Sequence, residues 1–110
     1  GAFEVSKSGD IANWARTAND PTRQIGGAMD LAVGAKRLWV AMEHTTKGGG
    51  PRLRDACSYP LTARGVVRRV YTDLAVLDID ADGFVVIDMI PGLSQGDLQA
   101  RTEAKLRFAC

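Results

Sequence analysis

The stretch of this sequence that most constrains its fold is residues 26–46, in which a double glycine precedes a continuous apolar run. Adjacent glycines allow a sharp turn and a close approach of the backbone to a ligand, because neither residue has a Cβ atom. A short helical pattern follows and ends at Gly34, a residue suited to a helix C-cap. The apolar run 38–42 then predicts a strand covered on both faces, within a strand expected over residues 37–45.

A glycine turn at the start of a helix also has chemical potential. The first N–H groups of a helix lack helical partners, so they can bind an anion or stabilise the oxyanion of a reacting carbonyl. The alternative for Gly26 and Gly27 is a turn that only begins the helix. The sequence of the turn leaves both interpretations open.

The patterns that flank this stretch predict further strands and a hairpin. Residues 1–6 alternate with a period of two, and residues 66–71 and 73–80 are expected to be strands, the second with Leu74, Val76 and Ile79 as its apolar packing residues. The turn at residues 81–83 joins the last of these to residues 84–90 as an antiparallel pair.

Helical elements are expected to be short. Pro51 suits the first position of a helical turn over residues 51–57, on which Arg52 and Arg54 would face water. Ser94 predicts an N-cap, with Asp97 three residues later as in a capping box, and Leu98 is the expected buried residue of that helix. Residues 106–108 form a final short strand or tail.

Composition limits the classes of function. The 110 residues carry a formal net charge of +1, which argues against a nucleic-acid partner. No apolar run approaches the roughly 18 residues of a membrane span, and no signal peptide begins the chain, so we expect a soluble cytoplasmic protein of one domain. Cys57 and Cys110 are too few for a disulfide framework, and Cys57 is expected to be a small buried apolar group.

Two polar clusters invite a functional interpretation. Residues 78–83 resemble the opening of a calcium-binding loop, but Met89 stands where that loop needs its bidentate acid, so a hairpin turn is favoured. Glu43 and His44, at the end of the central strand, form the most inviting acid/base pair, because parallel strands place chemistry at their carboxyl ends. No second histidine or cysteine lies near His44, so no metal site is expected.

Several sequence blocks, in order, resemble the second half of the beta subunit of the 3-oxoacid CoA-transferases. They are GGAMDL at 26–31, MEHTTK at 42–47, YPLTA at 59–63, YTDLAV at 71–76 and RTEA at 101–104. The block GDIANW at 9–14 is most similar to the 3-oxoadipate branch. The resemblance implies an α/β fold: the C-terminal portion of a three-layer α/β/α fold, with a mixed, mostly parallel sheet and a hairpin near residues 74–90. Residues 1–110 would then be one partial domain without its N-terminal half.

The resemblance also implies a mechanism and a set of site residues. In this family a glutamate attacks an acyl-CoA and then carries CoA as a glutamyl thioester to a 3-oxo acid. Backbone N–H groups at Gly26, Gly27 and Ala28 would face the reacting carbonyl. Asn13 and Trp14 are assigned to substrate binding, although a loop aromatic packed on the core is the alternative for Trp14. Glu43 and His44 are expected to support the site, since the glutamate motif of the family is absent from residues 1–110.

CoA enters this scheme as a substrate, and no bound cofactor is expected. Arg52 and Arg54 could contact the phosphates of CoA, but a solvated helix face is the favoured interpretation. The implied partners are the alpha subunit and the missing half of the beta subunit, with self-association of the chain through its uncovered apolar surface. The alternative function is a non-catalytic, oligomeric ligand-binding module.

Overall fold

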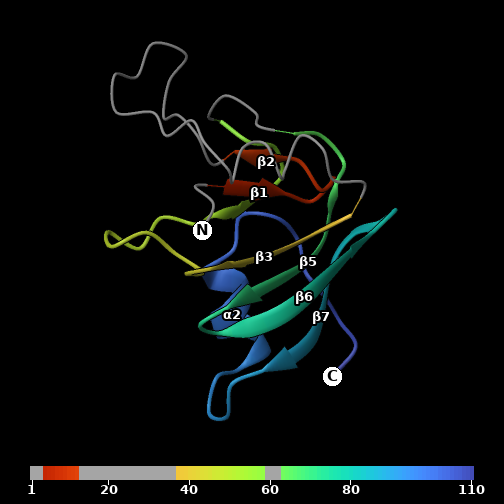
Figure 1. Ribbon diagram of the computed structural model, residues 1–110. Helices are drawn as coiled ribbons and strands as arrows, with labels where there is room; N and C mark the ends of the chain where they lie inside the picture. The colour runs from red at the N-terminus through yellow and green to blue at the C-terminus, as the bar shows by residue number, and fades with distance from the viewer. Residues whose placement is uncertain (1–3, 13–36, 59–62) are drawn as a thin grey trace.

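The computed structural model describes residues 4–12, 37–58 and 63–110, and their strands form two sheets (Figure 1). The smaller sheet has the order β2-β1-β4, and the larger has the order β3-β5-β6-β7-β8. In chain order the elements are β1 (Glu4–Ser6), β2 (Ile11–Ala12), β3 (Leu38–Met42), β4 (Leu53–Arg54), β5 (Val67–Thr72), β6 (Ala75–Asp80), β7 (Gly83–Met89), α2 (Gln95–Ala100) and β8 (Arg107–Phe108).

Strand pairing is mixed in both sheets. Among the described strands, β1–β4, β3–β5 and β7–β8 are parallel, whereas the other three neighbouring pairs are antiparallel. The expected hairpin is confirmed as β6 and β7, and the expected strand over residues 66–71 is confirmed as β5. The α/β class and the mixed pairing are therefore confirmed. The described strands are not mostly parallel as expected, because the β5–β6 and β6–β7 pairs are joined by short turns that reverse the chain.

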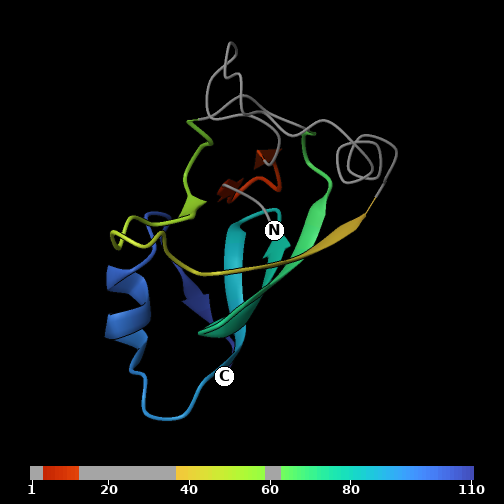
Figure 2. The same cartoon turned by 60° about the vertical axis from the view of Figure 1, so that its left-hand side comes forward.

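One face of the five-stranded sheet packs against the three-stranded sheet and α2 (Figures 1 and 2). Strand β6 shows why: Ala75, Leu77 and Ile79 are buried and alternate with half-buried residues, as a period of two requires. The core is completed by side chains from every layer, among them Val5, Leu53, Val70, Phe84, Val86 and Leu98. The core thus joins segments that lie far apart in the sequence.

The turn after β1 is attached to the start of β5 through Gly9. The Gly9 carbonyl accepts hydrogen bonds from the N–H groups of Val66 (3.1 Å) and Val67 (3.0 Å). Gly9 has φ +84°, and a Cβ atom there would lie 2.8 Å from the Val67 carbonyl oxygen. Only glycine combines this backbone conformation with so close an approach.

The C-terminal predictions are confirmed. Helix α2 begins after Ser94, whose side chain accepts a hydrogen bond from the Asp97 N–H at 3.0 Å, and Leu98 is fully buried. The expected final strand is β8, which pairs in parallel with β7. The N-cap residue in the sequence therefore predicted the start of this helix correctly.

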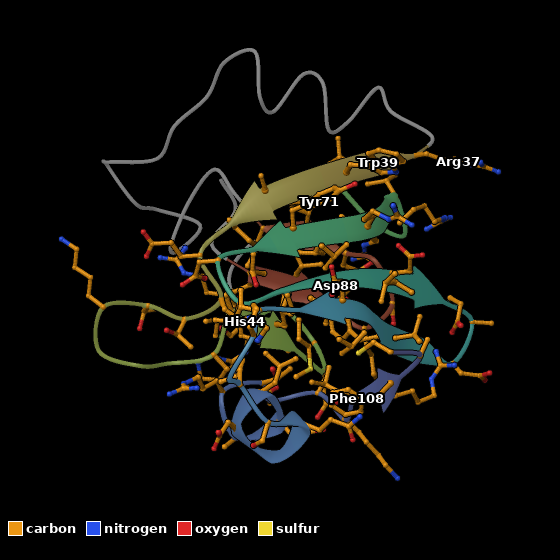
Figure 3. All side chains as sticks on the ribbon, turned by 90° about the horizontal axis from the view of Figure 1, so that it is seen from below. Arg37, Trp39, His44, Tyr71, Asp88 and Phe108 are labelled. Carbon is orange, nitrogen blue, oxygen red and sulfur yellow. The ribbon has the colours of Figure 1, made fainter. Side chains whose placement is uncertain are left out.

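Two local predictions are wrong. Residues 51–57 do not form a helical turn, because Leu53 and Arg54 pair in parallel with β1, and strand pairing overrides the weak preference of a short segment. Strand β3 is not covered on both faces: Trp39 is 64% exposed. It contacts Tyr71, with ring centroids 6.1 Å apart, on the face turned away from β1 (Figure 3). Strand β3 is an edge strand of the described sheet, so its apolar run does not imply two covered faces.

Candidate functional site

The structure describes only part of the predicted site. Gly26, Gly27 and Ala28 lie outside the described residues, as do Asn13 and Trp14. Glu43 and His44 are described and directly follow β3. The geometry of the site is therefore that of the strand ends around these two residues.

The carboxyl ends of β3 and β5 lie side by side. Met42 pairs with Thr72 in the parallel register, so Glu43 and His44 leave the sheet beside Asp73. The His44 N–H donates a hydrogen bond of 2.8 Å to the Asp73 carboxylate. Thus the connection that follows β3 is held to the one that follows β5, at the edge where parallel strands usually place chemistry.

The imidazole of His44 is fully buried and bonded on both sides. Its Nδ1 atom lies 3.0 Å from the Thr72 hydroxyl, and its Nε2 atom lies 2.7 Å from the Thr102 hydroxyl. Burial lowers the pKa of His44 below its ordinary value; Asp73 opposes this shift and Arg101 adds to it. We call His44, Thr72, Asp73 and Thr102 the His44 network.

The His44 network also supports the glycine-rich loop between β3 and β4. Thr45 and Pro51 form an isolated antiparallel bridge at the base of this loop, and the Arg52 N–H donates to the His44 carbonyl at 3.2 Å. Within the loop, the hydroxyl of Thr46 accepts the Gly50 N–H at 3.0 Å. The path of the loop therefore depends on where His44 is held.

A second polar network connects β1 and β4 of the three-stranded sheet. Glu4 is 2% exposed; its carboxylate lies 3.0 Å from Arg54 Nε and accepts hydrogen bonds from the N–H and hydroxyl of Ser58. Arg54 Nη2 lies 2.9 Å from the Glu103 carboxylate. We call Glu4, Arg54, Ser58 and Glu103 the Glu4 network. The expectation that Arg54 faces water is wrong, because its guanidinium lies between two carboxylates.

Cys57 adjoins the Glu4 network and is half-buried rather than fully buried. Its thiol donates a weak hydrogen bond of 3.7 Å to the Asp10 carbonyl. Burial, with the nearby carboxylates of Glu4 and Asp10, raises the pKa of Cys57 to about 12. A thiol in this state is a poor nucleophile at neutral pH.

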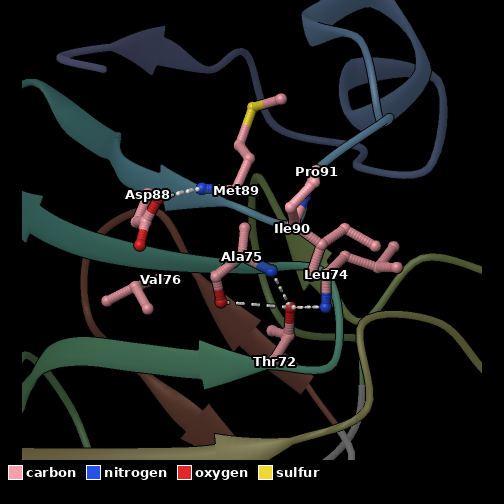
Figure 4. Close-up of a pocket in the computed structure, with 8 residues that line it drawn as sticks. All are labelled: Thr72, Leu74, Ala75, Val76, Asp88, Met89, Ile90 and Pro91. Carbon is pink, nitrogen blue, oxygen red and sulfur yellow. Dashed lines mark hydrogen bonds between the residues drawn. The ribbon is translucent and has the colours of Figure 1, made fainter.

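An open pocket of about 260 Å³ adjoins the His44 network (Figure 4). Its lining is mostly aliphatic, and it shares Thr72 with the network. The lining residues are Thr72, Leu74, Ala75, Val76, Asp88, Met89, Ile90 and Pro91. One carboxylate oxygen of Asp88 accepts the Met89 N–H at 2.9 Å. The pocket offers an apolar surface beside the strand ends.

The two acidic residues of β6, Asp78 and Asp80, have arginine partners. Asp78 accepts a 3.0 Å hydrogen bond from Arg69 Nη2, and Asp80 pairs with Arg107. The turn at residues 81–82 joins β6 and β7, as the sequence predicts. Within the part of the chain that the structure describes, no group of three or more His, Cys, Asp or Glu side chains could hold a metal ion.

The sequence alone indicated His44 as a site residue but neither of the partners of its ring. Thr72 and Thr102 lie 28 and 58 residues from it in the chain. Both belong to sequence blocks that carry the family resemblance, YTDLAV and RTEA, and these blocks were the available signal. The sequence around Glu4 likewise does not indicate that its side chain pairs with Arg54.

No helix in residues 4–12, 37–58 and 63–110 has the length and apolar character needed to cross a membrane.

Comparison with known proteins agrees with this fold. The family model described as "Coenzyme A transferase" matches residues 1–100, and the chain belongs to that family. The chain is 45% identical over 106 residues to the beta subunit of the 3-oxoadipate CoA-transferase of Acinetobacter baylyi, an alignment that covers 96% of the chain and 49% of the relative. It is 40% identical over 105 residues to the beta subunit of the succinyl-CoA:3-ketoacid coenzyme A transferase of Helicobacter pylori, with 96% and 50% covered.

A solved structure supports the fold. The acyl-CoA transferase YdiF of Escherichia coli O157:H7 superposes with a TM-score of 0.75 at 18% identity, over 98% of this chain and 25% of that one. The chain thus spans about half the length of the curated relatives it matches.

Proposed function

We propose that this chain is part of a CoA-transferase beta subunit. The complete enzyme would move CoA between an acyl-CoA, such as succinyl-CoA, and a 3-oxo acid, such as 3-oxoadipate or acetoacetate. The observation that carries this proposal is the 45% identity, over 96% of the chain, to the beta subunit of a 3-oxoadipate CoA-transferase. The strand ends around the buried His44 are consistent with it, because they lie beside a pocket with a mostly aliphatic lining.

In the proposed reaction a glutamate outside residues 1–110 attacks the thioester carbonyl of the acyl-CoA. The acyl group passes to this glutamate as a mixed anhydride, and CoA thiolate leaves and then attacks the glutamyl carbonyl. The released carboxylate departs, and the resulting glutamyl thioester transfers CoA to the 3-oxo acid by the reverse sequence. Covalent catalysis of this kind divides one difficult transfer into easier steps.

This chain would supply the surroundings of the reacting carbonyl. The N–H groups of Gly26, Gly27 and Ala28 would stabilise the oxyanion of each tetrahedral intermediate. Asn13 and Trp14 would contact the acyl group. Glu43 and His44 would hold the connection that leaves β3 without contacting the substrate.

Two of the chain's glutamates are already paired with an arginine, which supports a nucleophile outside residues 1–110. The chain has three in all, Glu4, Glu43 and Glu103. Glu4 is buried, and both Glu4 and Glu103 pair with Arg54. Glu43 is exposed at the strand end.

We expect the chain to act with the remaining half of the beta subunit and with an alpha subunit. We also expect it to be located in the cytoplasm and to associate with further copies of itself.

A reconstituted enzyme tests the proposal. The chain is joined to the N-terminal half of the Acinetobacter baylyi relative and combined with the matching alpha subunit, and transfer from succinyl-CoA to 3-oxoadipate is measured. Gly27→Val should reduce turnover by roughly 100-fold, the scale of one lost oxyanion donor, while Gly48→Ala, in the exposed loop, serves as the control. Transfer that is equal in both variants would remove the oxyanion turn from the mechanism.

The isolated chain provides the complementary test. Incubation with succinyl-CoA, followed by borohydride or hydroxylamine trapping and mass spectrometry, should reveal no glutamyl-CoA adduct. An adduct at Glu43, absent in Glu43→Gln, would instead identify this chain as a minimal transferase. If both the isolated chain and the reconstituted enzyme bind acyl-CoA but neither transfers CoA, the alternative of a non-catalytic ligand-binding module would be favoured.

A further inference from the structure

We propose that His44 is a positioning residue, held as the neutral tautomer with its proton on Nε2, which joins the end of α2 to the end of β5. The proposal follows from counting hydrogen atoms around two threonine hydroxyls. Each hydroxyl has one hydrogen to donate and two lone pairs that accept. The backbone partners of Thr102 and Thr72 then determine where the imidazole proton lies.

The Thr102 side requires a donor on the ring. The Thr102 hydroxyl lies 2.9 Å from the Leu98 carbonyl, one turn earlier in α2, and a carbonyl can only accept. The single hydroxyl hydrogen is therefore directed to Leu98. The 2.7 Å contact with His44 must then be donated by the ring, so Nε2 carries a proton.

The Thr72 side requires an acceptor on the ring. The Thr72 oxygen already accepts the N–H groups of Leu74 (3.1 Å) and Ala75 (3.0 Å), which occupy both lone pairs. Its hydrogen has two candidate acceptors, the Ala75 carbonyl at 3.3 Å and His44 Nδ1 at 3.0 Å. The closer contact is satisfied only if Nδ1 has no proton.

The other states of the ring leave the network unsatisfied. A proton on Nδ1 would be a third hydrogen directed at the Thr72 oxygen, whether the ring is neutral or charged. The doubly protonated ring is further opposed by burial, which is the largest influence on the pKa of His44. Of the neighbouring charged groups, Asp73 favours the protonated ring and Arg101 disfavours it. Protonation would therefore break the Thr72 contact and retain the Thr102 contact.

The backbone of His44 transmits this arrangement to the loop between β3 and β4. Its N–H is bonded to Asp73 and its carbonyl to the Arg52 N–H. The ring and backbone together thus join the ends of three elements, α2, β3 and β5, at the base of the loop. Only the expected effect on turnover rests on the proposed function, since the network itself lies entirely among described residues.

The tautomer is measurable by NMR on the ¹⁵N-labelled 110-residue chain. His44 is the sole histidine of the sequence, so its ring signals need no assignment by mutation. Long-range ¹H–¹⁵N correlation at pH 7.5 should reveal a protonated Nε2 and an unprotonated Nδ1. The Thr102→Val variant, which removes the acceptor for Nε2–H, should weaken this preference. An Nδ1–H tautomer or an even mixture in the wild-type chain would overturn the proposal.

Two amide variants separate the halves of the network. A Gln amide can place a donor near the position of Nε2, and an Asn oxygen can place an acceptor near the position of Nδ1. In His44→Gln, hydrogen exchange of the Leu74 and Ala75 amides should be at least about tenfold faster than in wild type, while exchange of the Thr102 amide changes by less than about twofold. His44→Asn should have the opposite pattern. Identical exchange in both variants would contradict the directional network.

In the reconstituted transferase, His44→Gln should lower kcat by about tenfold or more with little change in KM, because a displaced loop impairs alignment more than binding. Equal kcat in the variant and the wild type would refute the positioning role. Absence of transfer in the wild-type reconstitution would count against the proposed function alone, and the NMR and exchange results on the chain would still decide the proposal.

Discussion

The two polar networks each connect separate chain segments around one buried titratable side chain, Glu4 or His44, but they do so with different chemistry. The Glu4 network joins β1, β4 and the segment after α2 through a carboxylate that is 2% exposed and a guanidinium. The His44 network joins β3, β5 and the end of α2 through a ring that is fully buried and two hydroxyls. The Glu4 network is held together by opposite charges. The His44 network is held together by hydrogen bonds in which each group must act as donor or acceptor in a fixed direction.

This difference determines how each network should fail. A buried charge that loses its partner retains most of its desolvation cost, so a pair of opposite charges is broken at high cost. A hydroxyl that loses one of several partners keeps the others, so the loss is smaller. The Glu4 network should therefore be more important for stability, whereas the His44 network should be more sensitive to pH and to the direction of its donors.

The largest effect is expected from Arg54→Met, which keeps an unbranched apolar stem but removes the charged guanidinium group. The Glu4 carboxylate would lose its guanidinium partner while remaining buried, so the free energy of unfolding should fall by about 3 kcal/mol or more. Urea denaturation followed by circular dichroism measures the change. Adding Glu4→Gln to this variant should restore much of the loss; a double variant as unstable as the single one would contradict charge compensation as the cause.

A smaller effect is expected from His44→Phe, which preserves most of the ring volume without its nitrogen atoms. Thr102 would still donate to the Leu98 carbonyl, and Thr72 would still accept two backbone N–H groups. The free energy of unfolding should therefore fall by about 1–2 kcal/mol in the same urea experiment. A loss larger than that of Arg54→Met would reverse the ranking of the two networks.

The pH dependence of stability should distinguish the networks between pH 7.5 and 5. Because the pKa of His44 is lowered in the folded state, the unfolded chain binds this proton first as the pH falls below about 6.5. Stability should then decrease with falling pH until the folded-state pKa is passed, with a slope of at most about 1.4 kcal/mol per pH unit. His44→Phe should lose this component of the slope, and an unchanged pH profile in the variant would assign the titration to other groups.

The smallest effect is expected from the surface pair of Lys7 and Asp55, whose charged atoms lie 3.6 Å apart with both side chains more than half exposed. Asp55→Asn should change the free energy of unfolding by no more than about 0.5 kcal/mol. This variant is a matched control for Arg54→Met, since each removes one charge and the two consecutive residues differ in exposure. A similar loss in both would indicate that charge itself, rather than burial, explains the Arg54 result.

Local patterns predicted the elements whose partners lie nearby in the sequence. The β6–β7 hairpin follows from alternating strands and a turn at residues 81–83, and α2 follows from the Ser94 cap and Leu98. These elements form through contacts within a few residues, so their chemistry is visible in a short window. The family resemblance likewise follows from sequence blocks, and the match of residues 1–100 to the coenzyme A transferase family confirms it.

The sequence by itself therefore determined the family, the α/β class and the regular C-terminal elements. The tertiary structure alone decided the pairing of Leu53 with Val5, the exposure of Trp39 and the partners of Glu4 and His44. Thr102 lies 58 residues from His44 in the chain, and Arg54 is similarly remote from Glu4, so no local propensity records either contact. A buried polar group must find partners for its hydrogen bonds or its charge once water is excluded. Those partners are the groups that the folded chain brings within reach, and only the tertiary structure determines which groups these are.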